Sequence, residues 1–431
     1  MNLLSRFYRH TMDKGMGRAL RHRDYALFSL SSWISTVGFW IQRLAVGWLT
    51  WELTHSTAWL GAMALGHALP ALFLAPFAGA VADRLDRLML MRATQSGTIV
   101  LTGLLAWFVI ADRITVEIMF VIIVADGIVI AFNMPARMTI APALVPREDL
   151  TAAISVNSFL WQSSAFLGPA LAGVIVAAWG LGPAFIVNAL SFLPFYGVLF
   201  IIKLKNVDKR AKTGKSLFGD AWDGLSYCAR HPGIGPIVLS AFLMSFLARP
   251  LTDLLPGFVG DIFQAGPAAL GNLMSGLGVG GMIGSLWMAN RNRIEGATLI
   301  YFGGMITLLL LTLLFAMNQS LMVAMAIMVG MGFAGSSAGN AAQTLIQYSV
   351  EGSHRARVLA LLSLSHQAPA LGAMLLGGLA TMVGLGLSIG LGAGAGLLIV
   401  LWIARRLSVI APALEHPAPA EEPSAQPAGP N

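Results

Sequence analysis

Residues 167–182 of this chain read LGPALAGVIVAAWGLG, and residues 371–386 read LGAMLLGGLATMVGLG. The two stretches keep glycine at matching positions, in the pairs Gly168 and Gly372, Gly173 and Gly377, and Gly180 and Gly384. Two further pairs, Gly79 with Gly284 and Arg43 with Arg249, lie at nearly the same spacing. A near-constant spacing at three places predicts that the chain consists of two halves with the same internal order.

The segments around these stretches are apolar and long enough to cross a bilayer. Of the 431 residues, 56% are hydrophobic and only 11% are charged, whereas soluble domains carry about 25% charged residues. A spanning helix needs about 20 apolar residues. We predict spans at residues 25–50, 57–81, 89–111, 116–136, 151–178, 183–203, 234–259, 267–289, 297–316, 319–347, 357–382 and 387–405. The sequence therefore predicts an all-α membrane protein whose twelve transmembrane helices form two parallel-repeat six-helix halves.

Lysine and arginine residues collect in alternate loops. All but three of the 27 Lys and Arg residues lie in the N-terminal segment, in even-numbered loops or after the last span, and the exceptions are Arg43, Arg113 and Arg249. Cytoplasmic loops retain Lys and Arg, so we predict a multi-pass plasma-membrane protein with cytoplasmic N- and C-termini. Loops that meet anionic lipid explain the net charge of +7. We expect no nucleic-acid partner, because no stacking module accompanies the charge.

The longest predicted cytoplasmic loop divides the chain into its two halves. We expect a cytoplasmic N-terminal segment at 1–23, the first half at 24–204, a linker with an amphipathic helix at 205–233, the second half at 234–408 and a proline-rich disordered tail at 409–431. The single cysteine, Cys228, excludes an internal disulfide and a cysteine metal cluster. We expect no metal and no cofactor, and the chain has no phosphate-binding loop of the Walker type.

Residues 79–87, GAVADRLDR, occupy the predicted cytoplasmic loop after the second span. Gly79 lets two helices approach closely, Asp83 can face a helix N-terminus, and the basic side chains can pair with carboxylates. We interpret this segment as an inner gate that holds the cytoplasmic ends of the two halves together in one state. Its members are Gly79, Asp83, Arg84, Asp86 and Arg87. The alternative is a basic loop that only sets the topology.

Four charged residues fall well inside predicted spans, away from the span ends, namely Arg43, Asp126, Arg249 and Asp253. A charge at the centre of a spanning helix costs about 2.5–3.5 kcal/mol and usually marks function. We expect Arg43 to pair with Asp126, and Asp253 to pair with Arg249 one helical turn away. Two roles stay open for Asp126, which is either a structural counter-ion or a carboxyl group that exchanges a proton during the functional cycle. Arg43 and Arg249 either control a pathway or only fix packing.

Several polar side chains in the predicted spans can hydrogen-bond a ligand in a central cavity. They are Gln42, Asn157, Gln162, Asn340, Gln343, His366 and Gln367. Each can instead hydrogen-bond a neighbouring helix. The GSSAG pattern at residues 335–339 matches that of serine hydrolases, but no strand precedes it. We therefore do not expect an enzyme.

The 79–87 segment resembles the signature loop of the major facilitator superfamily, in a DRxDR variant with Asp86 in place of the usual glycine and Leu88 in place of the second basic residue. In the fifth span, Gly168, Pro169 and Gly173 resemble the Gly-Pro motif of that superfamily's exporters. The stretches STVGFW (35–40), WELT (51–54) and NMPAR (133–137) are similar to the drug:proton antiporter subgroup that includes the enterobactin and macrolide exporters. The resemblance covers most of residues 24–405.

This resemblance implies a secondary active transporter of the bacterial inner membrane, with proton-driven export of a small amphipathic compound of the drug or siderophore class by alternating access. The implied partners are a small-molecule substrate, protons as coupling ion and the lipid bilayer, and we expect a monomer. The superfamily's exporters often carry an arginine in span four, but we place none deep in this one, since Arg137 counts among the loop cations. Two alternatives stay open: an importer of a small metabolite on the same scaffold, and a non-transporting membrane receptor.

Overall fold

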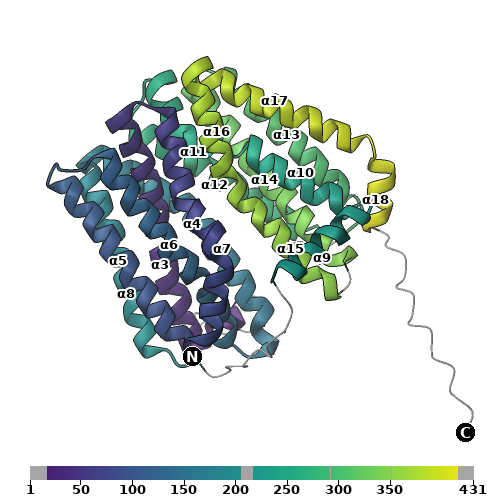
Figure 1. Ribbon diagram of the computed structural model, residues 1–431, viewed down its shortest axis with the longest axis horizontal. Coiled ribbons are helices and arrows are strands. Elements are labelled where there is room, and N and C mark those ends of the chain that lie inside the picture. Colours follow the sequence, from purple (N-terminus) through teal and green to yellow (C-terminus); the bar gives the residue numbers. More distant parts are fainter. Residues whose placement is uncertain (1–16, 205–216, 292, 351, 416–431) are drawn as a thin grey trace, which may run out of the picture.

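The computed structural model describes residues 17–204, 217–291, 293–350 and 352–415, and these residues form helices and short connections with no strand. Figure 1 shows two helical bodies side by side, the first coloured purple to blue and the second mainly green to yellow. The predicted all-α fold of two helical halves is confirmed.

The first half consists of six long helices that follow one short helix. Their bounds are α2 (Gly17–Leu20), α3 (Arg23–Thr54), α4 (Thr57–Arg84), α5 (Arg87–Ile110), α6 (Val116–Ala143), α7 (Leu150–Trp179) and α8 (Leu181–Ile201), with a 3-10 turn, η1 (Arg147–Asp149), before α7. Several of these helices begin at a residue whose side chain caps the first backbone amides. The carboxylate of Asp86 accepts a hydrogen bond from the Met89 amide at 2.8 Å, and the Thr115 hydroxyl accepts one from Ile118 at 3.3 Å.

The second half repeats this arrangement with two interrupted spans. After the linker helix α9 (Leu217–Arg230) come α10 (Ile234–Leu247), α11 (Leu251–Gly257), the π-helical turn η2 (Phe258–Ile262), α12 (Pro267–Ala289), α13 (Ala297–Met317), α14 (Leu321–Ser349), α15 (Gly352–Leu364), the 3-10 turn η3 (Ser365–Gln367), α16 (Ala368–Val383), α17 (Leu385–Ala404) and α18 (Leu407–Glu415). The turns between α7 and α8 and between α16 and α17 both rest on a glycine with positive φ, Gly180 at +83° and Gly384 at +87°. These two glycines are partners in the sequence repeat.

Eleven of the described helical segments have the length and hydropathy of a bilayer-spanning segment. The other predicted span is α3, which at 32 residues is long enough but contains many serine and charged side chains. Several of its serines are buried and donate to carbonyl groups of α3 itself, as Ser31 and Ser35 do. This internal pairing keeps polar groups of α3 away from lipid. Together these segments account for the twelve predicted spans.

Four predicted segments differ from the structure. α6 continues to Ala143, beyond the predicted end at residue 136. The predicted spans at 234–259 and 357–382 are not continuous helices, because α10 ends before Pro250 and α15 ends at the turn η3. The start of the predicted disordered tail is helical, since α18 buries Leu414 and places the Glu415 carboxylate at the start of α13, where it accepts hydrogen bonds from the amides of Gly296 (2.7 Å) and Thr298 (2.9 Å). Residues 416–431 lie outside the described residues.

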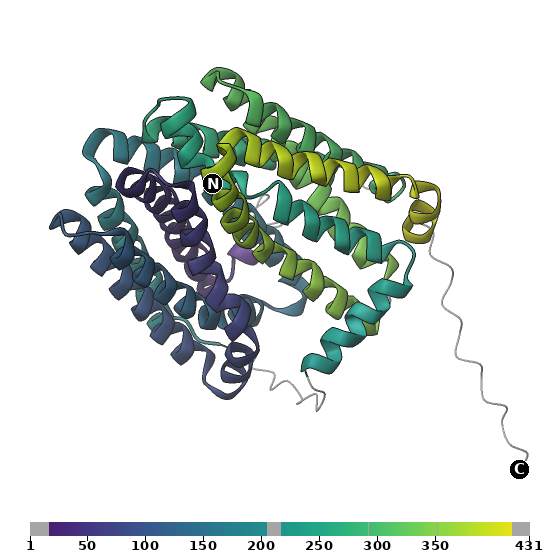
Figure 2. The ribbon, with the colours of Figure 1, turned by 45° about the horizontal axis from the view of Figure 1, so that its top comes forward.

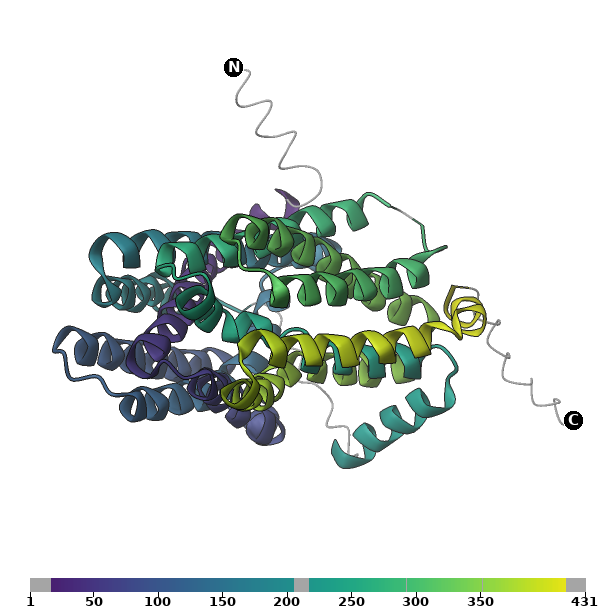
Figure 3. The ribbon, with the colours of Figure 1, turned by 90° about the horizontal axis from the view of Figure 1, so that it is seen from above.

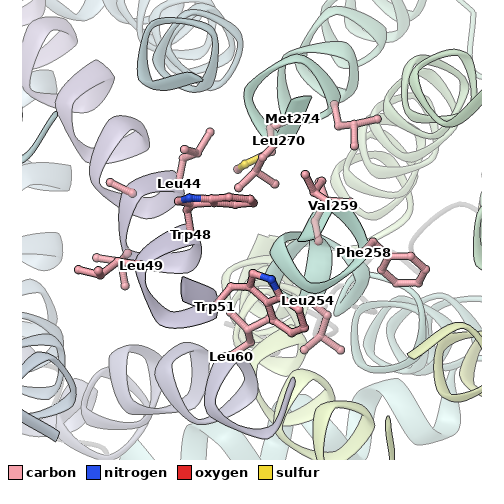
Figure 4. Close-up of a cluster of buried hydrophobic side chains, with 14 of the residues drawn as sticks. Leu44, Trp48, Leu49, Trp51, Leu60, Leu254, Phe258, Val259, Leu270 and Met274 are labelled. Atoms are coloured by element: carbon pink, nitrogen blue, oxygen red, sulfur yellow. The ribbon is translucent and has the colours of Figure 1, made fainter. Parts of the chain in front are cut away.

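The buried apolar side chains form three clusters, and only one of them includes both halves. One cluster draws only on residues 19–202 and another only on residues 228–414. The third joins α3, α4, α11 and α12 through side chains such as Trp48, Trp51, Leu254 and Leu270 (Figure 4). It lies near the loops that follow α3 and α16, away from α9. We call the end of the bundle that holds α9 and the connection after α4 the α9 end, and the other the closed end.

The linker helix α9 packs on the second half. The Tyr227 ring stacks on His354 of α15 with ring centroids 4.5 Å apart, and Arg357 lies 3.6 Å from the Asp223 carboxylate. Figures 2 and 3 show α9 as the teal helix next to the grey linker trace, beside the second half and apart from the helices of the first. The helix predicted inside the linker is therefore present, and its partner is α15.

Candidate functional site

An ion pair joins the two halves toward the closed end. The Arg43 Nη2 atom on α3 donates to Asp253 Oδ1 on α11 at 2.6 Å. Arg249 lies just before α11. The expected ion pair of Asp253 with Arg249 is not among the ion pairs of the described residues, in which Asp253 pairs with Arg43. The expected pairing of Arg43 with Asp126 is wrong, because the helix break before α11 brings Asp253 to α3.

Asp126 lies deep inside the first half. Its side chain on α6 is almost fully buried, its Oδ2 atom is 3.7 Å from His67 Nε2 on α4, and its Oδ1 atom has no hydrogen-bond partner among the described residues. Gly127 allows this approach, since a Cβ atom there would lie 2.4 Å from the His67 carbonyl oxygen. A buried carboxylate with an unpartnered oxygen is costly, and whether Asp126 is a structural counter-ion or a proton carrier stays a prediction.

A second link between the halves is polar and uncharged. Gln162 on α7 donates to the Ser285 hydroxyl on α12 at 3.3 Å, and Asn340 on α14 donates to the same hydroxyl at 3.2 Å. Ser336 also lies 2.7 Å from it. The structure thus brings together two of the predicted cavity residues, Gln162 and Asn340, through a serine that the sequence analysis did not select.

The other predicted cavity residues fall in different surroundings. Gln42 is buried and bonded to Asn188 on α8, so its amide serves helix packing. Gln343 is exposed on α14. His366 and Gln367 belong to the turn η3, and the His366 side chain lies outside the described residues. Asn157 is exposed on α7 and lines a recess described below.

The predicted inner gate lies at the α9 end, where the halves share no buried cluster. α4 ends at Arg84, which is exposed, and Asp86 caps α5. A Cβ atom at Gly79 would meet nothing within 4 Å, so the close helix approach predicted there does not occur in this state. The side chain of Asp83 lies outside the described residues. The gating role of this segment stays a prediction.

The exporter-type motif in α7 lies at helix contacts. A Cβ atom at Gly168 would lie 2.3 Å from the Trp40 Cβ atom on α3, and one at Gly173 would lie 3.0 Å from the Gly271 Cα atom on α12. A Cβ atom at Gly271 would lie 2.7 Å from the Pro169 carbonyl oxygen. These small residues let α7 approach helices of both halves closely.

Sequence analysis missed one functional candidate, Arg137. Because α6 continues to Ala143, Arg137 lies within a spanning helix rather than in a loop. Its guanidinium donates to the Ser32 hydroxyl and, at 3.0 Å, to the Thr36 hydroxyl on α3, and it lies 5.7 Å from the centre of the Phe195 ring. Pro135 lies inside this helix, where neighbouring helices can satisfy the backbone groups that a proline frees.

The architecture and these charged contacts define a class of protein, the multi-pass transporter built from two repeated helical halves. A family model described as "Transmembrane secretion effector" matches residues 18–427. The chain therefore belongs to this family of the major facilitator superfamily, which confirms the resemblance. It is a transporter and not an enzyme.

Curated relatives are transporters of small compounds. The staphyloferrin A transporter of Staphylococcus aureus (strain NCTC 8325 / PS 47) is 24% identical over 359 residues, which is 83% of this chain and 90% of that protein. The enterobactin exporter EntS of Shigella boydii serotype 4 (strain Sb227) is 23% identical, covering 84% of this chain and 86% of its own length. Macrolide efflux protein A of Streptococcus pyogenes is 22% identical, with 61% and 66% covered.

Solved structures show the same fold at low identity. The nucleoside transporter NupG superimposes with a TM-score of 0.70 and 13% identity, covering 89% of this chain and 99% of that one. A bacterial homologue of the iron transporter ferroportin, in an inward-facing state, gives a TM-score of 0.67 and 18% identity, with 89% and 99% covered. These likenesses place the chain in the major facilitator fold.

Proposed function

We propose that this protein exports a small amphipathic compound of the drug or siderophore class from the cytoplasm, by alternating access driven by protons. The observation that carries the proposal is the distribution of the buried clusters. A shared apolar core joins the halves at the closed end, whereas at the α9 end each half has a core of its own. Rocking of two separate cores about a central contact is how such a repeat alternates its access.

The curated relatives support the export direction and the substrate class. Enterobactin is the substrate named for one relative and macrolides for another, and both of those relatives are named as exporting proteins. The positive-inside pattern supports a cytoplasmic α9 end with both termini on that side. In this orientation the end at which the halves share no buried cluster faces the cytoplasm, where a compound for export would enter.

Protons as coupling ion are supported by the Asp126 and His67 pair. The two side chains are 3.7 Å apart inside the first half, and one Asp126 oxygen has no described partner. Uptake of one proton would neutralise a poorly compensated charge, and its release would restore it. No nucleotide-binding loop is present in the sequence, so an ion gradient is the available driving force.

The test is efflux from cells loaded with a panel of dyes, antibiotics and siderophores, with and without a protonophore. Protonophore-sensitive loss of one compound, absent in empty-vector cells, would support proton-driven export and identify the substrate class. Efflux that persists with the protonophore would overturn proton coupling. If the protein is in the membrane and no compound leaves the cells, uptake of the same compounds should be measured to test the importer alternative.

A further inference from the structure

Arg137 is a cation within a spanning helix that has no described counter-charge. Its described polar partners are the hydroxyl groups of Ser32 and Thr36. Among the described residues no carboxylate lies within ion-pair distance of it, in contrast to Arg43. A desolvated charge is expensive unless an opposite charge accompanies it. Such a cation is a site where an anionic group from outside the chain gains binding energy.

The space beside Arg137 is an amphipathic recess between α3, α6 and α7. It encloses about 20 Å³, enough for one water-sized group such as a carboxylate oxygen, and is otherwise open to solvent. Aromatic and apolar walls come from Tyr25, Phe28, Trp33, Leu160 and Trp161. The polar lining consists of Ser29, Ser32, Thr36, Asn157 and Arg137. The Arg137 guanidinium and the exposed Asn157 amide thus line the same recess as the indole rings of two tryptophans.

The recess lies on the face of α3 that also carries Arg43. Tyr25, Ser29, Ser32 and Thr36 recur at helical spacing with Arg43, so these residues share one face of α3. Arg43 on that face contacts Asp253 of the second half. On α7, Gln162 beside the recess contacts Ser285 of the second half. The recess therefore lies on the same face of α3 as the Arg43 contact with the second half, nearer the α9 end.

The geometry points to a subsite for the oxyanion of an amphipathic organic acid, held by Arg137 and Asn157 with its apolar part against Trp33 and Trp161. An arginine fork matches the two oxygens of a carboxylate. Ser32 can add a donor, since its hydroxyl accepts from Arg137 and keeps its own hydrogen available. This inference deepens the proposed function, on which it rests, by making the exported compound an anion.

The test measures binding and needs no transport. Full-length protein in nanodiscs of zwitterionic lipid is titrated by calorimetry with a panel of aromatic carboxylates led by 1-naphthaleneacetate. The methyl ester of 1-naphthaleneacetic acid and 1-naphthylethylammonium serve as neutral and cationic control ligands of similar size. We expect the carboxylate to bind more tightly than both. We expect Arg137→Gln to weaken carboxylate binding by about 10- to 100-fold, the usual worth of a charged hydrogen bond, and to leave the ester unchanged.

Two further variants and one control sharpen the result. Arg137→Lys keeps the charge but loses the fork, so its carboxylate affinity should lie between those of wild type and Arg137→Gln. Asn157→Ala removes an exposed amide with no described hydrogen-bond partner, so this variant should fold even if Arg137→Gln does not. Its affinity for the carboxylate should fall several-fold. Arg230→Gln removes an exposed cation on α9 and should change nothing.

Three results would overturn the subsite: no binding by any carboxylate, equal affinity for acid and ester, or equal behaviour of Arg137→Gln and Arg230→Gln. A phosphate of an anionic lipid has the same chemistry. Loss of carboxylate binding in phosphatidylglycerol nanodiscs would assign the subsite to lipid and overturn its assignment to the exported compound. Carboxylate selectivity without efflux of any compound would contradict the export proposal alone. Efflux that is insensitive to Arg137→Gln, with no acid selectivity in binding, would contradict the subsite alone.

Discussion

The ion pair of Arg43 with Asp253 joins the two halves and is only partly buried. The Arg43 side chain is 42% exposed and that of Asp253 is 12% exposed. Exposed pairs contribute about 0.2–1 kcal/mol, which is small beside the apolar core around it. The pair is therefore suited to bias the choice between two states of the transporter and contributes little to holding the fold together.

We expect Asp253→Asn to lower transport severalfold at equal membrane abundance, with little change in the melting temperature. The reason is that Arg43 loses its partner in the state closed at this end. A double-mutant cycle with Arg43→Gln, followed by thermal unfolding, should give a coupling energy of about 0.2–1 kcal/mol. Asp261→Asn is the control, since Asp261 is exposed in the turn η2. If Asp253→Asn and Asp261→Asn transport equally well, the ion pair of Arg43 with Asp253 has no role in transport.

Proton coupling can be tested by a substitution of Asp126 that changes one side-chain oxygen to an amide nitrogen. Asn has the same shape as a protonated Asp but cannot exchange a proton, so Asp126→Asn should abolish the dependence of transport on the pH gradient. Downhill movement of the substrate should remain. The measurement is efflux from vesicles with an imposed pH gradient, compared with the same vesicles without one. Retained coupling would reduce Asp126 to a structural partner of His67.

At the scale of elements, α4 and α16 approach each other so closely at the closed end that glycine is required. A Cβ atom at Gly377 would lie 2.4 Å from the Thr57 carbonyl oxygen, while the Thr57 hydroxyl donates to the Gly377 carbonyl at 2.8 Å. At the neighbouring Gly378 a Cβ atom would meet nothing within 4 Å. The chain thus contains a matched pair of sites for testing closure.

Gly377→Ala should separate α4 from α16 and disfavour the state closed at this end, at a cost of about 1–3 kcal/mol for overpacking. Gly378→Ala should behave like wild type. Distances between spin labels on the ends of α4 and α16, in a background where Cys228 is replaced by serine, report the closure directly. An unchanged distance distribution in Gly377→Ala would show that this contact does not control the closed end.

The corner between α9 and α10 depends on a neutral histidine. His231 Nδ1 accepts hydrogen bonds from the amides of Gly233 and Ile234, each at 3.2 Å, and both bonds require that this nitrogen carries no proton. Burial lowers the pKa of His231 below its usual value. The folded protein therefore binds this proton less readily than the unfolded chain, so the stability it contributes is complete above the unfolded pKa of about 6.5.

This stability should be lost as the pH falls from about 6.5 through the lower pKa of the folded state. His231→Asn keeps an acceptor near the same place but cannot titrate, so its melting temperature should fall less than that of the wild type between pH 7.5 and 5. The measurement is thermal unfolding across this pH range. Parallel curves for the two proteins would show that the corner does not sense pH.

For the whole molecule, the state described here is joined at the closed end and separate at the α9 end. The inner gate would act in the opposite state, when the α9 ends meet. We expect Asp83→Ala to lower turnover while insertion into the membrane stays normal, because a gate changes the populations of states and not the topology. Transport and membrane abundance are measured together. Normal transport at equal abundance would leave residues 79–87 with a topological role alone.

Much of the architecture was predictable because hydropathy, charge and repeat spacing are properties of the chain read in order. The spans of α4, α5, α12, α13 and α17 were placed within a few residues of their observed ends. The repeat of Gly180 and Gly384 also proved structural, since both adopt a backbone conformation that favours glycine. The extent of α6 was not predictable in the same way, because Pro135 is accommodated inside a helix that its neighbours support.

The sequence by itself determined a multi-pass helical transporter of two repeated halves, since each span must satisfy its backbone and bury its apolar surface locally. Only the tertiary structure decided which charges meet. Arg43 contacts Asp253 of the other half, Asp126 faces His67, and Arg137 projects between helices with no described counter-charge. The physical reason is that partner choice depends on how helices distant in sequence are placed and rotated against one another. No local pattern in the chain specifies that placement.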